Sequence, residues 1–224
     1  MKKVLFLMVG MMTLMSCKIN GIGWDSNQIE PSDNVVTKAY KLQPFKEVKM
    51  TCVGHVEIIQ DESKDGTVEL TAPDNYIELF KFESNEKKLR IGFSRDNVNI
   101  TSKKVKIRVY TNDLIELENS GAASISIDSL DTDRLEIVNS GVGSINISGI
   151  ADDVEIVNSG VGSINAEKLK ALNVKANVSG VGSITCYASE RIEGRVSGVG
   201  SLKYAGNPKT KDNKRSGVGS IKAM

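Results

Sequence analysis

One six-residue motif constrains the fold of this chain more than any other feature. Ser-Gly-Val-Gly-Ser-Ile occurs four times, and two near-copies complete a series whose members begin at Ser120, Ser140, Ser159, Ser179, Ser197 and Ser216. The steps between these starts are 20, 19, 20, 18 and 19 residues. A motif that returns at a near-constant step of this size is the signature of a solenoid, in which each repeat stacks on its neighbours.

Each repeat contains two short runs in which apolar and polar residues alternate, as in residues 135–139 and 144–147. Such alternation predicts half-buried β-strands, and the β-branched residues in these runs favour the same structure. The motif glycines lie between the runs, where the chain must turn. We therefore expect φ above zero at the first glycine of each motif. These repeat corners are Gly141, Gly160, Gly180, Gly198 and Gly217.

Stacking the repeats aligns apolar residues into columns. The first column is Ile125, Ile145, Ile164, Ile184, Leu202 and Ile221; the second is Ile127, Ile147, Ala166, Cys186, Tyr204 and Ala223; the third is Leu117, Ile137, Ile156 and Ala176. A single coil cannot bury its apolar side, but stacked coils bury a continuous core and pair at about 4.8 Å. The sequence thus predicts an all-β fold, a right-handed parallel β-helix with coils of about 19 residues.

A column of amides precedes the motif at Asn119, Asn139 and Asn158 and continues as Val178 and Val196. Stacked amides can hydrogen-bond along such a pile. Because valine replaces asparagine in the later coils, we expect this column to be buried and structural.

The chain ahead of the regular coils is less periodic. Residues 51–58 align with the motif and predict a diverged first coil. Phe82–Phe93 predicts a hairpin, and Asp74 is expected to cap one helical turn.

We expect a single β-helix domain over residues 35–224, with irregular coils in 35–118 and regular coils in 119–224. Residues 17–34 contain Gly, Pro and Ser with little periodicity, and we expect them to form a tether.

Residues 1–16 have the features of a secretory signal, because Lys2 and Lys3 precede an apolar run too short to span a bilayer. Leu14-Met15-Ser16-Cys17 resembles a bacterial lipobox, in which the cysteine after the cleavage site carries the lipid. The alternative is an ordinary signal with an incidental cysteine. Cys17 is the predicted lipidation site, and Lys18 after it favours the outer membrane without deciding which side.

Composition narrows the function classes. The formal net charge is +1 with 25% charged residues, which gives no support for nucleic-acid binding. Cys52 and Cys186 lie several coils apart, beyond disulfide reach, so we expect both to be free and Cys186 to be buried.

Catalytic and metal-binding patterns are weak. The one histidine, His55, occupies a repeat position, and the repeated serines recur too regularly to be nucleophiles. Asp131, Asp133 and the pair Asp152-Asp153 fall between predicted strands, where solvated turns are expected. No phosphate-binding loop or zinc spacing occurs, so no catalytic residue, metal or cofactor is predicted.

With these motifs in hand, the chain resembles the head GIN domain of auto-transporter adhesins, a family of Gram-negative envelope proteins. The resemblance covers about residues 44–222 and rests on residues 45–58, 89–93 and 105–109 and on the Ser-Gly-Val-Gly-Ser-Ile series. It implies a right-handed parallel β-helix and supplies no catalytic residues.

Two classes of function follow. The first is a non-enzymatic envelope lipoprotein whose solenoid surface binds glycan or protein, since long stacked faces are what solenoids offer to ligands. The second is a polysaccharide-acting enzyme, which needs clustered carboxylates and basic residues; Arg134, Arg191 and Arg195 fall in different coils. A purely structural spacer is a third interpretation that the sequence does not separate from the first.

The last repeat, residues 216–221, lacks a following capping helix, so we expect an exposed edge there. Lys222 and a charged loop over residues 209–215 are expected to limit strand pairing at this edge. The expected partner is a second copy in a weak end-to-end dimer, or a strand of another envelope protein.

Overall fold

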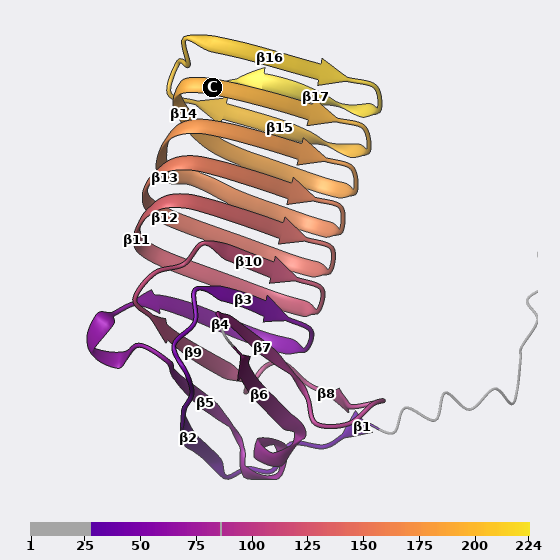
Figure 1. Cartoon of the computed structure of the whole chain (residues 1–224). Helices are drawn as coiled ribbons and strands as arrows, with labels where there is room; N and C mark the ends of the chain where they lie inside the picture. The colour runs from indigo at the N-terminus through magenta and orange to yellow at the C-terminus, as the bar shows by residue number, and fades with distance from the viewer. Residues whose placement is uncertain (1–27, 86) are drawn as a thin grey trace, which may run out of the picture.

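The regular half of the protein is a right-handed parallel β-helix, as predicted (Figure 1). The computed structural model describes residues 28–85 and 87–224. The regular coils are built from β11 (Ala122–Asn139), β12 (Val142–Asn158), β13 (Val161–Val178), β14 (Val181–Val196), β15 (Val199–Ala205), β16 (Thr210–Arg215) and β17 (Val218–Ala223). Each long strand bends around one coil, and the parallel register pairs equivalent motif positions, for example Ser144 with Ser163.

The predicted columns form the core. Ile145 pairs with Ile125 on one side and Ile164 on the other, and all three are buried. The first and third columns keep this register through the stack. In the second column the register shifts after Asn146, but Ile147 and Ala166 are both still buried.

The asparagine column is a buried ladder, as expected. The amide nitrogen of Asn119 donates to Oδ1 of Asn139 at 2.9 Å, and that of Asn139 donates to Oδ1 of Asn158 at 3.0 Å. At the end of the ladder, Asn158 donates to the carbonyl of Gly162 at 3.0 Å. The next coil can have a valine, Val178, at this position because the Asn158 amide donates to a backbone carbonyl. No unsatisfied polar group is then left facing Val178.

The glycine prediction was right about position and wrong about conformation. Gly141, Gly160, Gly180, Gly198 and Gly217 do lie at the break between strands, yet none has a positive φ. A positive φ occurs instead at the second glycine of three motifs, with +135° at Gly143, +139° at Gly162 and +158° at Gly182. The first glycine is required for another reason: a Cβ on Gly141 would lie 2.1 Å from the carbonyl oxygen of Gly121 in the coil below. Glycine is therefore required at this position because the backbones of adjacent coils approach closely, and not because the turn needs a positive φ.

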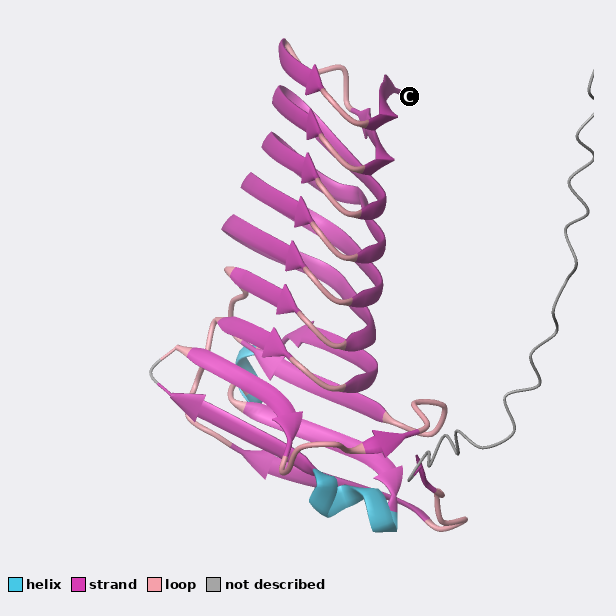
Figure 2. Ribbon diagram, turned by 90° about the vertical axis from the view of Figure 1, so that its right-hand side faces the viewer, coloured by secondary structure: helices cyan, strands magenta, loops and turns pink. Residues whose placement is uncertain are grey.

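The amino-terminal half differs from the predicted irregular coils, because part of it is antiparallel (Figures 1 and 2). Its elements are β1 (Gln28–Ile29), β2 (Val35–Lys41), β3 (Glu47–Met50), β4 (Val53–Gln60), η1 (Glu62–Lys64), β5 (Thr67–Pro73), η2 (Asp74–Leu79), β6 (Phe80–Asn85), β7 (Lys88–Phe93), β8 (Asn99–Ile100), β9 (Lys106–Thr111) and β10 (Glu116–Asn119). Strands β3, β4 and β10 continue the parallel stack, so the predicted first coil is confirmed. Strands β2, β5 and β9 pair antiparallel and close this end of the helix. The predicted hairpin is confirmed as β6 and β7.

Part of the predicted tether, residues 28–34, is docked on the closed end. Strand β1 pairs with β8, and the Tyr76 hydroxyl donates to the carbonyl of Ile29. The capping prediction for Asp74 was wrong, because η2 begins at this residue and its amino-terminal cap is Pro73. The Asp74 carboxylate instead accepts hydrogen bonds from Ser32 and Asn34 and holds the docked segment.

The opposite end carries a polar closure that the sequence analysis did not foresee. The expected charged loop is in fact strand β16, whose inward positions are polar where earlier coils have apolar residues. Arg215 follows Val196 in the asparagine column, and its guanidinium donates to the carbonyl of Gly219 at 2.7 Å. Asn213 follows Gly194 and lies 3.5 Å from the Tyr204 hydroxyl.

Candidate ligand-binding face

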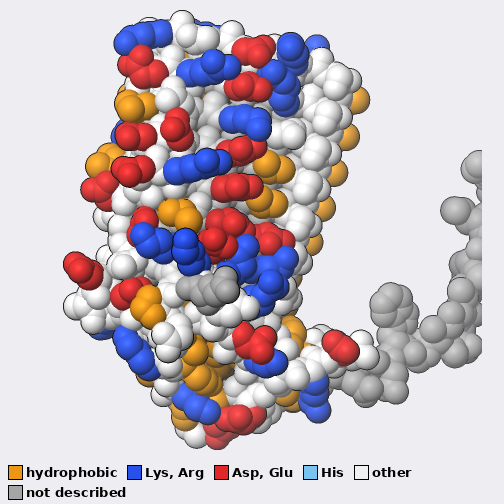
Figure 3. Space-filling model, in the orientation of Figure 1, with side chains coloured by type: hydrophobic (Ala, Val, Ile, Leu, Met, Phe, Trp, Pro, Cys, Tyr) orange, Lys and Arg blue, Asp and Glu red, His pale blue; other side chains and the backbone are white. Residues whose placement is uncertain are grey.

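One side of the stack, which we call the charged face, carries charged side chains at its outward positions. Its backbone is β3, β10, the carboxy-terminal halves of β11 to β14, and β16. The register places one outward residue per coil in a single row, made of Glu47, Glu116, Glu136, Glu155, Lys175, Glu193 and Asp212. Figure 3 shows acidic and basic side chains intermixed over this side.

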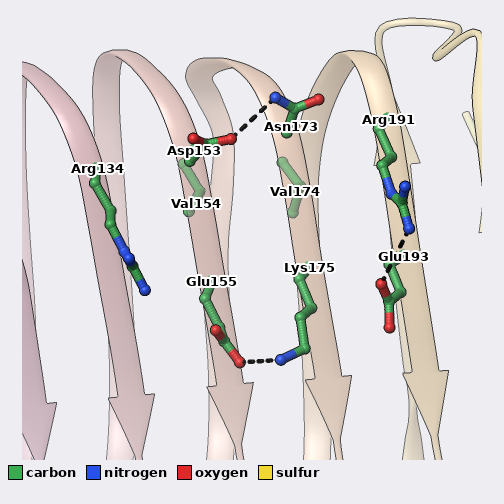
Figure 4. Close-up of a pocket in the computed structure, with 9 residues that line it drawn as sticks. All are labelled: Arg134, Asp153, Val154, Glu155, Asn173, Val174, Lys175, Arg191 and Glu193. Carbon is green, nitrogen blue, oxygen red and sulfur yellow. Dashed lines mark hydrogen bonds and ion pairs between the residues drawn. The ribbon is translucent and has the colours of Figure 1, made fainter.

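A second row lies beside the first, at Arg134, Asp153, Asn173 and Arg191. Between the two rows is a shallow hollow of about 470 Å³ (Figure 4). Val154 and Val174 form its floor, with 4% and 3% of their surface exposed. The hollow therefore has an apolar base and polar walls, open to solvent along its length.

Four of the charged residues that line the hollow form ion pairs, Glu155 with Lys175 of the next coil and Arg191 with Glu193 of the same strand. Lys175 contacts Glu155 at 2.6 Å, and this hydrogen bond raises the pKa of the Lys175 ammonium. Arg195 bridges Glu193 at 3.1 Å and Asp212 at 2.9 Å, and its hydrogen bond lowers the pKa of the Asp212 carboxyl. Both shifts favour the charged forms at neutral pH.

Arg134 differs from these groups. Among the described residues its guanidinium has no ion-pair or hydrogen-bond partner, and Figure 4 shows it free on the side of Glu155. The Asp153 carboxylate accepts one hydrogen bond, from Asn173 at 2.9 Å. The hollow thus offers an unpaired guanidinium next to acceptors with spare capacity, a set that can hydrogen-bond hydroxyl, carboxylate or amide groups.

The charged face continues toward the closed end through shared ion pairs. Lys88 lies between Glu47 at 3.1 Å and Glu116 at 2.7 Å, and Lys49 contacts Glu118 at 2.7 Å. These pairs link β3, β7 and β10 across the charged face.

The family model described as "Putative auto-transporter adhesin, head GIN domain" matches residues 44–208. This match covers most of the chain. The chain belongs to this family. No curated protein matches it.

Solved structures resemble this GIN domain over most of its length. A putative adhesin from Bacteroides fragilis is 29% identical and has a TM-score of 0.76, covering 88% of this chain and 100% of its own. A putative adhesin from Parabacteroides distasonis is 18% identical with a TM-score of 0.55, and covers the same shares. A structure described as a putative lipid binding protein, also from Parabacteroides distasonis, is 20% identical with a TM-score of 0.54, covering 88% of this chain and 99% of its own. The last two show the fold alone.

The GIN domain brings together residues that the sequence analysis had separated. Arg134 and Arg191 line the same hollow, three coils apart in one row, although the sequence analysis treated them as scattered. Asp153 lies in strand β12 and lines the hollow, while it was expected in a turn. The two arginines do lie in different coils, as predicted, but stacking aligns them in one row, because residues about 19 apart in the chain become neighbours. Asp153 was expected in a turn, but β12 continues through it without a break.

The remaining predicted positions lie away from the hollow. His55 is exposed in the column of motif serines on β4. Cys52 and Cys186 are both free, and Cys186 is buried, as predicted; Cys52 is buried as well. Cys17, the predicted lipidation site, lies outside the described residues.

No helix in the described part of the GIN domain is both long enough and apolar enough to cross a bilayer. Residues 28–85 and 87–224 contain no cluster of three or more His, Cys, Asp or Glu suited to a metal ion.

Proposed function

We propose that this protein is a non-enzymatic lipoprotein of the cell envelope whose charged face binds a glycan or protein ligand in adhesion. The observation that carries the proposal is the hollow between the two charged rows, with Arg134 unpaired at its edge. The family and the adhesin from Bacteroides fragilis support an adhesion role.

The arrangement of the acids favours binding over hydrolysis. A glycosidase needs two carboxyl groups free to face the scissile bond, one as acid and one as base or nucleophile. Here Glu155 and Glu193 are each engaged in an ion pair, with Lys175 at 2.6 Å and with Arg195 at 3.1 Å. The hollow is also open and shallow, whereas catalytic pockets enclose most of their ligand.

Binding is tested with the full-length protein in detergent on an array of glycans and envelope proteins. Arg134→Ala and the charge reversal Lys175→Glu should each weaken capture about tenfold or more, because each removes a cation from the hollow wall. Lys168→Ala, an exposed lysine that does not line the hollow, is the matched control. Equal capture by wild type and Arg134→Ala would reject the charged face as the binding site.

The same array separates the alternatives. Release of new reducing ends from a bound polysaccharide would favour the enzyme interpretation. A protein that captures nothing while remaining folded would favour the structural spacer.

We further propose lipid anchorage at Cys17, in the outer membrane. The lipobox after the apolar run supports it. Cys17→Ala should release the protein from membrane fractions or block its maturation, as followed by fractionation and gel mobility. A variant that fractionates and migrates like wild type would contradict lipidation.

A further inference from the structure

A second surface of the coils, opposite in character to the charged face, is formed by the valines of the motif. We call Val142, Val161, Val181, Val199 and Val218 the apolar row. The register stacks them directly above one another. Their exposed fractions are 56%, 53%, 55%, 57% and 79%. Figure 3 shows hydrophobic side chains along the right-hand edge of the coils.

An unbroken apolar row on a surface is unusual for a protein that acts alone. Single exposed apolar residues need no explanation, but contiguous patches mark interaction sites. The row repeats once per coil through five successive coils, so it forms one stripe instead of scattered contacts.

A groove runs parallel to the apolar row on its amino-terminal side. It has a volume of about 540 Å³ and is lined by the motif serines and first glycines, such as Ser140 and Gly141, together with the valines. The glycines leave this strip without side chains because the neighbouring coil allows no Cβ there. Ridge and groove share the coil spacing of about 4.8 Å, so the ridge of one copy matches the groove of another.

The absence of charged residues on this surface indicates which kind of partner it binds. From Ser140 to Ser201 the outward motif positions around the row are Ser, Val and again Ser, none of them charged. A charged ligand finds no partner there, while a second copy brings the same neutral surface and meets no like charge. The charged face would meet its own charges if it were the contact between copies.

We infer that the apolar row and its groove are the contact surface between two copies of this chain. A two-fold axis makes such a contact self-complementary, with each ridge in the other groove. Five coils at about 4.8 Å and residues 140–146 at about 3.3 Å each give a patch of about 550 Å² per copy. The total of about 1,100 Å² lies just below the range of standard specific interfaces, so the dimer is weak.

This contact differs from the end-to-end dimer expected from the sequence. The last coil places Asn213 and Arg215 at inward positions. Inward-pointing polar groups disfavour the pairing of an edge with another chain. The apolar row carries no such protection.

Cysteine cross-linking of the full-length protein in cell membranes tests the inference. Val142→Cys, Val161→Cys, Val181→Cys and Val199→Cys are made singly and oxidised, and dimers are read on non-reducing gels. Burial raises the pKa of the Cys52 and Cys186 thiols to about 12, which keeps them unreactive. Wild type gives the background from Cys17. Lys168→Cys, exposed at a different corner of the coil, is the matched control.

At least one valine position should cross-link about tenfold more than Lys168→Cys, since disulfides form only when Cβ atoms come within about 4.5 Å. Adding Val142→Glu and Val181→Glu to Val161→Cys should remove the cross-link, because unpaired charges would be buried. Adding Lys168→Glu should leave it intact. These substitutions are at exposed positions, and a melting curve confirms that the variants fold.

Two outcomes would overturn the inference: no cross-link above that of Lys168→Cys at any of the four valines, or a cross-link that survives the two glutamates. The inference does not depend on the proposed ligand. Arg134→Ala should lose ligand capture and keep the cross-link, so the two proposals can fail separately.

Discussion

The charged face and the apolar row belong to the same coils but repeat differently. Five coils place valine in the apolar row, whereas the charged row contains Glu, Lys and Asp in successive coils. Near the apolar row, backbones of adjacent coils lie so close that a Cβ on Gly162 would be 1.8 Å from the Gly143 carbonyl oxygen. On the charged face the outward side chains contact one another and solvent, as in the ion pairs of Glu155 with Lys175 and of Arg195 with Glu193. A residue type that repeats from coil to coil therefore reflects the stacked architecture. A residue type that varies from coil to coil can instead determine which ligand binds.

The interior shared by both surfaces should give the largest effect. Ile164→Ala should lower the free energy of unfolding by about 2–5 kcal/mol, because the buried side chain leaves a cavity in the first column. Ile164→Asp should prevent folding, since an unpaired buried carboxylate is not tolerated. Urea denaturation measures the first and soluble expression the second. A soluble, cooperatively unfolding Ile164→Asp protein would contradict the column.

The close stacking near the apolar row should give the next largest effect. Gly162→Ala should cost about 2–4 kcal/mol, because alanine is strained at a φ of +139° and its Cβ meets backbone. Ala123→Gly, at the equivalent position two coils earlier, is the control and should cost about 1 kcal/mol or less. Equal losses in urea denaturation would show that backbone approach does not explain the motif.

The charged face should show the smallest effect on stability. Arg195 holds the pKa of the half-buried Asp212 carboxyl below its ordinary value of 3.8. A group with a lowered folded pKa stabilises the fold above its ordinary pKa, and that contribution is lost as the pH falls through the folded pKa. Asp212→Asn should therefore show a slightly smaller loss of urea midpoint than wild type when the pH falls from about 6 to about 3. An identical acid response of the two proteins would mean that the pair adds nothing to stability.

The sequence predicted the regular coils well because periodicity and side-chain parity together determine which residues stack. Ile145 beside Ile164 and Asn139 beside Asn158 follow directly from a step of about 19 residues. The predicted conformation of Gly141 was wrong because parity places a residue on a face but does not determine its φ. The antiparallel strands β2 and β5 have no motif to reveal their pairing.

The hollow could have been found only by applying the repeat to residues outside the motif. Arg134, Asp153 and Asn173 differ in type, so no pattern of letters marks them as a row. Counting from the motif does place them at equivalent positions. The depth of the hollow depends on buried side chains such as Val154 and required the structure.

The docking of residues 28–34 on the closed end gives the solenoid a polarity. The chain enters at the end closed by antiparallel strands, and the last coil lies at the other end of the stack (Figure 1). With an anchor at Cys17, the closed end would face the bilayer and the polar Arg215 end would point outward. Two copies on one membrane would then stand side by side in parallel, each valine of the apolar row opposite its own counterpart. An antiparallel pair would place its two anchors at opposite ends and bridge two membranes. The valine positions that cross-link along the row therefore distinguish a parallel pair on one membrane from an antiparallel pair between two membranes.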